Sequence, residues 1–162
     1  MVKSLKSHNL ILLASDHNGF KLKNELKKYL IGKNFKCMDM GNVEYDKNDD
    51  YVDFAVRAAK KIALAKLKGI FICGSGVGMC IAANKVKGIR AANVTSIIGA
   101  KLSRKDSDAN VLCLGANMIN ATLVKKIVYV WLTTPFSNLI RYNRRIEKIN
   151  KYEKNNTSHI NE

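Results

Sequence analysis

Short apolar runs alternate with helical patterns along most of the chain. The run Leu10–Ala14 is apolar at every position, which is typical of a strand buried on both faces of a sheet. Similar runs predict further strands at 35–40, 69–73, 89–94 and 111–114. Because no hairpin turn signal separates alternating apolar runs, we expect the five strands to be parallel and joined by right-handed helical crossovers.

The segments between the strands have the apolar spacing of helices. From Phe20 to Leu30 the apolar residues recur at helical intervals, and Gly32 suits the helix end. The clearest helical face is that of Tyr51–Leu67, and further helices are predicted over 79–84, 97–102, 121–132 and 138–151. These elements predict one doubly wound α/β domain over residues 1–151, with a parallel five-stranded sheet between two helical layers. A polar, frayed tail is expected at 152–162.

The net charge of +15, from 28 Lys+Arg against 13 Asp+Glu, invites a nucleic-acid interpretation. However, the basic residues are 22 Lys and only 6 Arg, and Arg is the residue that makes bidentate contacts to phosphates and bases. The chain also lacks a basic stretch interleaved with aromatic residues. We therefore expect no nucleic-acid partner, and a nucleic-acid binder is kept only as a third hypothesis.

The remaining composition points to a cytoplasmic protein without a bound metal. The four cysteines include no C-x-x-C pair and lie in or beside apolar segments, which indicates free thiols in a reducing compartment. No stretch approaches the roughly 18 apolar residues of a membrane helix. No cluster of His, Cys and Asp has the spacing of metal ligands, so we expect neither a metal nor another cofactor.

Functional residue types gather after the first and third predicted strands, where parallel sheets bind ligands. The first strand ends in Ser-Asp-His-Asn-Gly at 15–19, and the third in Cys-Gly-Ser-Gly-Val-Gly at 73–78. Such a glycine loop can turn backbone N–H groups toward a phosphate, a carboxylate or an enediolate oxygen, and a helix beginning after it favours a thiolate at Cys73. That thiolate would be a nucleophile or a general base. The alternative is a tight turn beside a structural thiol.

Two further features suggest phosphate binding. His17 is a candidate phosphate ligand or acid, or a cap of the next helix. Arg141 and Arg145 are four residues apart in the last predicted helix, so they share a face that can clamp a phosphate; a solvated basic face is the alternative. A dinucleotide site is disfavoured because the G-x-G-x-x-G spacing is absent and the glycine loop follows the third strand.

The ordered motifs resemble those of the ribose-5-phosphate isomerase B family. They are Ser-Asp-His-Asn-Gly-Phe at 15–20, Ile-Cys-Gly-Ser-Gly-Val-Gly at 72–78, Ala-Ala-Asn-Lys at 82–85, Gly-Ile-Arg-Ala at 88–91, Leu-Ser-Arg at 102–104 and Asp-Ala-Asn-Val-Leu at 108–112. The resemblance covers about residues 9–150 and implies a Rossmann-like, three-layer fold and a metal-independent aldose–ketose isomerase. It also implies a homodimer or homotetramer in which the partner subunit helps to complete each site.

The resemblance also implies a role for each site residue. Cys73 would be the general base. The implied oxyanion loop is Gly74, Ser75, Gly76 and Gly78, and the implied substrate contacts are Asp16 and Tyr51 to the sugar and His17, Arg141 and Arg145 to the phosphate.

The chain departs from the family at Asp106 and Ser107, where a His-Asn pair is usual and the histidine helps to open the sugar ring. A carboxylate accepts a proton but does not readily donate one at neutral pH. Ring opening would then fall to His17 or Asp106, or occur spontaneously. The expected substrate pair is ribose 5-phosphate and ribulose 5-phosphate. The alternatives are galactose or allose 6-phosphate as substrate, or a catalytically impaired homologue that binds sugar phosphates.

Overall fold

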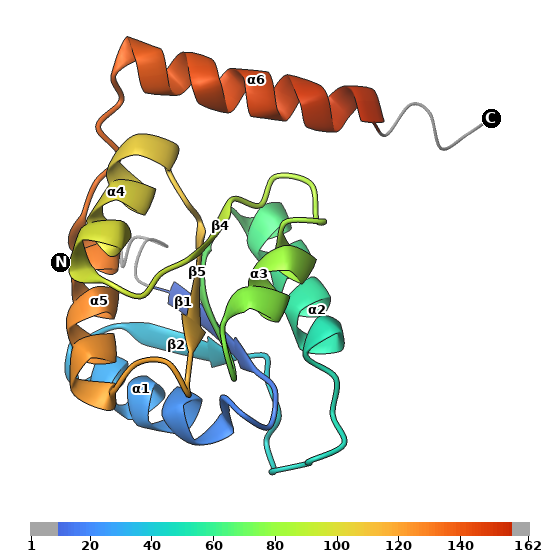
Figure 1. Cartoon of the computed structure of the whole chain (residues 1–162), viewed down its shortest axis with the longest axis vertical. Helices are drawn as coiled ribbons and strands as arrows, with labels where there is room; N and C mark the ends of the chain where they lie inside the picture. The colour runs from blue at the N-terminus through green and yellow to red at the C-terminus, as the bar shows by residue number, and fades with distance from the viewer. Residues whose placement is uncertain (1–9, 157–162) are drawn as a thin grey trace, which may run out of the picture.

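The computed structural model describes residues 10–156, which form a sheet with helices on both faces (Figure 1). Its strands are β1 (Leu10–Ser15), β2 (Lys36–Asp39), β3 (Lys68–Cys73), β4 (Ala91–Asn93) and β5 (Val111–Gly115). The strand order is β2-β1-β3-β5-β4, and every neighbouring pair is parallel. The predicted doubly wound α/β fold is therefore confirmed.

The core has two layers because alternate residues of each strand point to opposite faces. Ile11 and Leu13 of β1 belong to one hydrophobic cluster, and Leu12 and Ala14 belong to the other. Helices α1 (Phe20–Gly32), α4 (Ile97–Ser107) and α5 (Ala121–Thr133) cover the first face, whereas α2 (Tyr51–Ala65) and α3 (Val77–Ala83) cover the second. This arrangement explains why the strands have nearly continuous apolar sequences.

The strand order reverses between β1 and β3, so these two neighbours send their connections in opposite directions along the sheet. Their register places Ser15, the last residue of β1, beside Ile72, next to the end of β3. In an open parallel sheet, such a switch point leaves a crevice beyond the carboxyl ends of the strands. The loop after β1, residues 16–19, and the glycine loop after β3, residues 74–76, therefore lie next to one another at this edge.

Besides the last helix, β4 and α4 differ most from the sequence prediction. Strand β4 is shorter than the predicted strand at 89–94, because the Asn110 side chain accepts a hydrogen bond from the Arg90 backbone N–H at 2.8 Å. Helix α4 continues five residues past 102, because Arg104 is buried against the Trp131 ring and so takes the place of an apolar residue. The end of α4 consequently carries Asp106 and Ser107 to the amino edge, where the strands begin.

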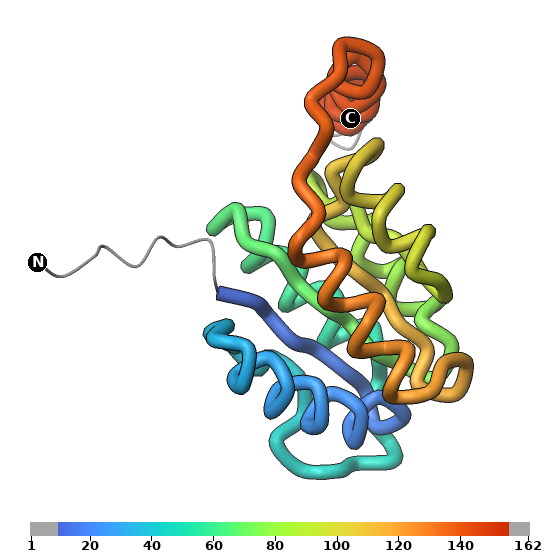
Figure 2. Tube along the Cα trace, turned by 90° about the vertical axis from the view of Figure 1, so that its left-hand side faces the viewer, coloured from blue at the N-terminus to red at the C-terminus, as the bar shows by residue number. Residues whose placement is uncertain are grey.

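The last helix, α6 (Ile140–Asn156), lies beyond the end of α5, apart from the two helical layers (Figure 2). It packs against α4, and Glu153 in its last turns accepts a hydrogen bond from the Gly88 N–H. Residues 152–156 are helical where a frayed tail was expected, and residues 157–162 lie outside the described part of the chain. Between residues 10 and 156, no helix is long and apolar enough to cross a membrane.

Candidate active site

A shallow pocket of about 470 Å³ lies at the carboxyl edge of the sheet, where β1 and β3 end. It is lined by Asp16 and Asn18 after β1, by Tyr51 at the start of α2, and by Cys73 with its glycine loop after β3. The structure thus brings together residues that the sequence places in three separate segments. Gly76 lies in the same loop but faces β4 and β5 instead of the pocket.

Glycine is required at two positions of the loop. Gly76 has φ of +79°, and a Cβ on it would lie 2.5 Å from the Asn93 side-chain oxygen. A Cβ on Gly78 would lie 2.7 Å from the ring carbon Cζ of Tyr51, so the tyrosine ring packs directly on the Gly78 backbone. The two glycines therefore let the loop approach β4 on one side and Tyr51 on the other.

The loop after Cys73 offers unused backbone donors. Cys73 is buried, and its Sγ accepts a hydrogen bond from the Gly76 N–H at 3.1 Å. The carbonyl groups of Cys73 and Gly74 are occupied by backbone N–H groups that follow β5, at 2.8 and 3.0 Å. Within residues 10–156, the N–H groups of Gly74, Ser75 and Gly78 have no protein acceptor. They are available to an anion beside the Cys73 thiol.

His17 is held by Asp49, which the sequence analysis missed. The Asp49 carboxylate accepts a hydrogen bond from His17 Nδ1 at 2.7 Å and one from the His17 backbone N–H at 3.0 Å. On the other side of the ring, Asn18 Nδ2 lies 2.9 Å from His17 Nε2. The hydrogen bond to Asp49 raises the pKa of His17 above its ordinary value of 6.5. His17 is thereby oriented next to the pocket and biased toward its cationic form.

A buried lysine anchors the loop that carries Asp49. Lys23 is fully buried, and its Nζ donates to Asp39 Oδ1 at 2.8 Å and to the Asn42 carbonyl oxygen at 2.6 Å. The Asn42 side chain in turn donates to the second Asp49 oxygen. Lys23 therefore links α1 and β2 to the loop that positions His17.

The opposite, amino edge of the sheet carries four of the expected site residues, which are Asp106, Ser107, Arg141 and Arg145. Ser107 ends α4, where its carbonyl accepts a hydrogen bond from Arg90 Nε at 3.1 Å, just before β4. Arg141 and Arg145 stand at the start of α6, both against the ring of Tyr142. In Figure 1 the end of α4 and the whole of α6 lie at the top, and the loops after β1 and β3 lie at the bottom.

Within one chain, Arg141 and Arg145 therefore do not lie near His17, although all three were expected to bind the phosphate. Helix α5 runs back from the carboxyl edge to the amino edge, so a helix that follows it begins at the amino edge. Asp106 is displaced for a similar reason, because α4 runs through it instead of ending at 102. Within one chain, the expected site residues are thus divided between the two edges of the sheet.

Comparisons with known proteins agree with this architecture. The family model described as Ribose/Galactose Isomerase matches residues 11–149. The chain is 46% identical over 146 residues to a probable ribose-5-phosphate isomerase B of Mycoplasma genitalium, covering 89% of this chain and 95% of the relative. It is 37% identical over 144 residues to ribose-5-phosphate isomerase B of Escherichia coli, covering 88% of this chain and 95% of that protein.

Solved structures give the same result. The crystal structure of ribose-5-phosphate isomerase B from Mycoplasma genitalium with bound ribulose-5-phosphate superposes with a TM-score of 0.86 at 45% identity, covering 90% of this chain and 96% of that one. The Clostridium thermocellum ribose-5-phosphate isomerase B has a TM-score of 0.86 at 38% identity, covering 90% and 98% of the two chains. The chain belongs to the ribose/galactose isomerase family and is a sugar-phosphate isomerase.

Proposed function

We propose that the protein interconverts ribose 5-phosphate and ribulose 5-phosphate through an enediolate, with Cys73 as the general base. The observation that carries this proposal is the Cys73 thiol beside three backbone N–H groups without an acceptor in residues 10–156, at the switch point of the sheet. The bound ligand of the Mycoplasma genitalium relative supports the choice of substrate. The cysteines are free thiols, which supports a place in the cytoplasm.

In the proposed reaction, the Cys73 thiolate takes the proton from C2 of the open-chain aldose. The electron pair forms the C1–C2 double bond, and the negative charge on O1 is held by the N–H groups of Gly74, Ser75 and Gly78. The proton on sulfur then returns to C1, while a proton passes from O2 to O1. We assign this second transfer to the Ser75 hydroxyl, which is exposed at the pocket.

The other residues of the carboxyl edge would orient the sugar phosphate. Asp16 is buried, and its Oδ1 accepts the Gly19 N–H at 3.0 Å, so the side chain is fixed beside the pocket for contact with sugar hydroxyls. Tyr51 packs on Gly78 and closes the pocket on the side of α2. The raised pKa of His17 suits an imidazolium that binds the phosphate.

We propose that a homodimer completes the site, with a homotetramer as a pair of such dimers. Asp106, Ser107, Arg141 and Arg145 lie too far along the sheet to act on substrate at Cys73 of their own chain, but a second copy can present its amino edge there. Large apolar side chains on α6 support a partner, since Ile140 is 87% and Tyr152 is 69% exposed. A two-fold axis would complete two sites at once.

The base is tested by Cys73→Ala in a ribose 5-phosphate turnover assay. We expect kcat to fall by about 10²–10⁴-fold, the usual contribution of a positioned base. Cys37→Ala is the matched control, because Cys37 lies on β2 away from the pocket, and its kcat should stay at the wild-type level. Turnover by Cys73→Ala at the wild-type rate would contradict the proposed mechanism.

The shared site is tested by mixing two inactive variants. Cys73→Ala removes the carboxyl-edge half, and Arg141→Ala removes the amino-edge half. After the two are unfolded and refolded together, about half of the dimers are mixed, and each mixed dimer has one intact site of two. Activity should return to about a quarter of the wild-type level. Mixed dimers that form but remain inactive would show that each chain builds its own site.

A catalytically impaired homologue is the second candidate, because Asp106 stands where the family has its ring-opening histidine. One Asp106 carboxylate oxygen is buried without a hydrogen-bond partner in residues 10–156, so this side chain carries an acceptor that the described chain does not satisfy. We expect Asp106→His to raise kcat on ribose 5-phosphate. If the wild type and Asp106→His both bind ribose 5-phosphate in calorimetry but neither turns it over, the binding role is favoured. If only galactose or allose 6-phosphate is turned over, that hexose phosphate is the substrate instead of ribose 5-phosphate.

A further inference from the structure

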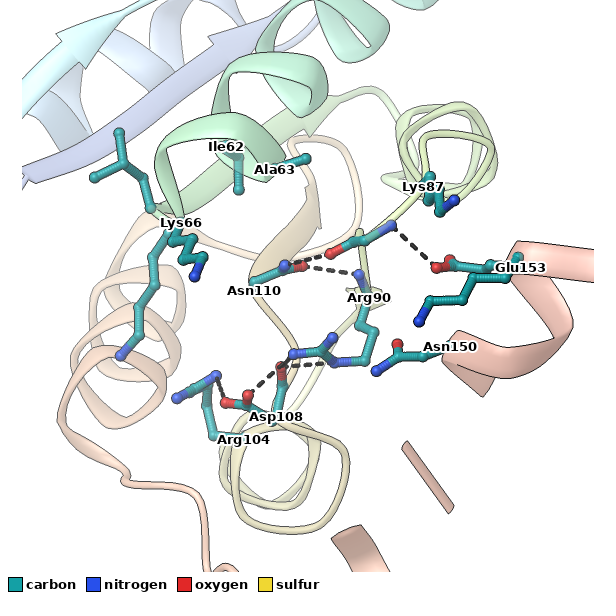
Figure 3. Close-up of a pocket in the computed structure, with 14 residues that line it drawn as sticks. Ile62, Ala63, Lys66, Lys87, Arg90, Arg104, Asp108, Asn110, Asn150 and Glu153 are labelled. Carbon is teal, nitrogen blue, oxygen red and sulfur yellow. Dashed lines mark hydrogen bonds and ion pairs between the residues drawn. The ribbon is translucent and has the colours of Figure 1, made fainter. Parts of the chain in front are cut away.

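A second pocket, of about 540 Å³, lies at the amino edge of the sheet and shares no lining residue with the pocket beside Cys73 (Figure 3). The starts of β3 and β4, the ends of α2 and α4, and the last turns of α6 surround it. Six cationic side chains line it, and only two carboxylates do, those of Asp108 and Glu153. The cations are Lys66, Lys68, Lys87, Arg90, Arg104 and Lys154. Its lining is therefore strongly positive.

The two carboxylates are already engaged. Asp108 pairs with Arg104 at 2.7 Å and with Arg90 at 3.0 Å, so one acid serves two guanidinium groups. Glu153 accepts a hydrogen bond from the Gly88 N–H at 3.1 Å. Among residues 10–156, no carboxylate pairs with Lys66, Lys68 or Lys87. The surplus positive charge is thus available to a ligand.

The floor of the pocket holds two cations close together in a partly dry environment. Arg104 is 6% exposed, and its Nε has no hydrogen-bond partner in the described chain. Its Cζ lies 5.7 Å from the centroid of the Trp131 ring, and Lys68 Nζ lies 5.8 Å from the same ring. Burial and the nearby Arg104 lower the pKa of Lys68. An anion bound beside these cations would relieve their mutual repulsion.

We propose that this pocket binds a small molecule with two or more linked phosphate groups. The phosphates would lie on Lys68 and Arg104, between the lysines at the rim, and the organic part would lie against the end of α2, where Ala63 and Leu67 line the wall. The volume is in the range of small-molecule sites. A single phosphate carries at most about two negative charges. Lys66, Lys68 and Lys87 together carry more positive charge than that and pair with no carboxylate of residues 10–156, which is why we propose linked phosphates.

The test is calorimetric titration of the full chain with ADP, with pyrophosphate and with orthophosphate, at low salt and in the presence of saturating ribose 5-phosphate. We expect ADP and pyrophosphate to bind and orthophosphate to bind at least tenfold more weakly. Tighter binding of ADP than of pyrophosphate would support the organic contact with α2, and equal binding would support recognition by the phosphates. No binding of either, or displacement of both by ribose 5-phosphate, would overturn the proposal.

Variants locate the site without disturbing the buried floor. Lys66→Ala/Lys87→Ala removes two exposed rim charges, and Lys60→Ala/Lys61→Ala removes two exposed charges from another part of α2. We expect the rim pair to weaken ADP and pyrophosphate binding by tenfold or more and the control pair to weaken it by less than threefold. Equal losses of affinity in the two variants would show that binding depends only on the net charge of the protein and would refute the proposed site. Because binding is read without turnover, the result is independent of the proposed isomerase activity.

Discussion

Replacing Lys23 by methionine removes a fully buried charge that supports both the fold and the candidate site. The variant loses a charge-assisted hydrogen bond to Asp39 at 2.8 Å and leaves the Asn42 carbonyl without its 2.6 Å partner. Breaking a buried ion pair costs about 3–5 kcal/mol. Asp39 is 19% exposed and keeps Lys27, so we expect the lower end, about 3 kcal/mol of unfolding free energy. For a chain of this length, that is about 6–12 °C in melting temperature.

Urea unfolding followed by circular dichroism at one fixed protein concentration measures this loss. The matched control is Lys28→Met, an exposed lysine on the same helix, which should change the unfolding free energy by less than about 0.5 kcal/mol. An NMR titration of His17 gives a second readout, because the anchored loop carries Asp49. Lys23→Met with wild-type stability, or a loss equal to that of Lys28→Met, would refute the assigned role.

Three further predictions concern the candidate site and its surroundings. Gly76→Ala should lower the free energy of unfolding by about 2–4 kcal/mol, because φ is +79° and the added Cβ would lie 2.9 Å from the backbone of β5. Thermal melting measures this loss, and a variant as stable as the wild type would contradict it. Asp49→Asn should return the pKa of His17 toward 6.5, which an NMR titration measures. The melting temperature of this variant should lie furthest below that of the wild type under pH 6.5, and the difference should shrink as the pH rises through the raised pKa of the wild-type His17. Iodoacetamide should alkylate Cys80 before Cys37, because a hydrogen bond from the Cys113 thiol lowers the pKa of Cys80 to about 7 whereas burial raises the pKa of Cys37. Mass spectrometry measures the order of alkylation, and the reverse order would refute this prediction.

The strands and most helices were predictable because their signals are local. The run at Leu10–Ala14 is apolar at consecutive positions, which a strand covered on both faces requires. The end of α4 was not predictable from apolar spacing, because the residue that packs there is Arg104, stacked on Trp131 from another helix. The start of β4 likewise depends on a side chain 20 residues away, that of Asn110.

The same distinction divides the candidate site. Asp16 and Cys73 follow buried strands directly, so their place at the carboxyl edge was predictable. Asp49 was hidden, since it lies 32 residues from His17 in an irregular loop, although several acidic residues before α2 were a visible signal. The positions of Arg141 and Arg145 depend on the direction in which α5 returns, which the spacing of two arginines does not contain.

The unused donors after β3 are main-chain groups, and this affects how the site tolerates sequence drift. The side chain of Val77 is exposed, so substitutions there leave the N–H groups of the loop in place. Only residues that change the path of the backbone, such as a replacement of Gly76, would remove those donors. A mutational scan would therefore detect these backbone donors only through the glycines that shape the loop, and would underestimate a contribution that no side chain makes.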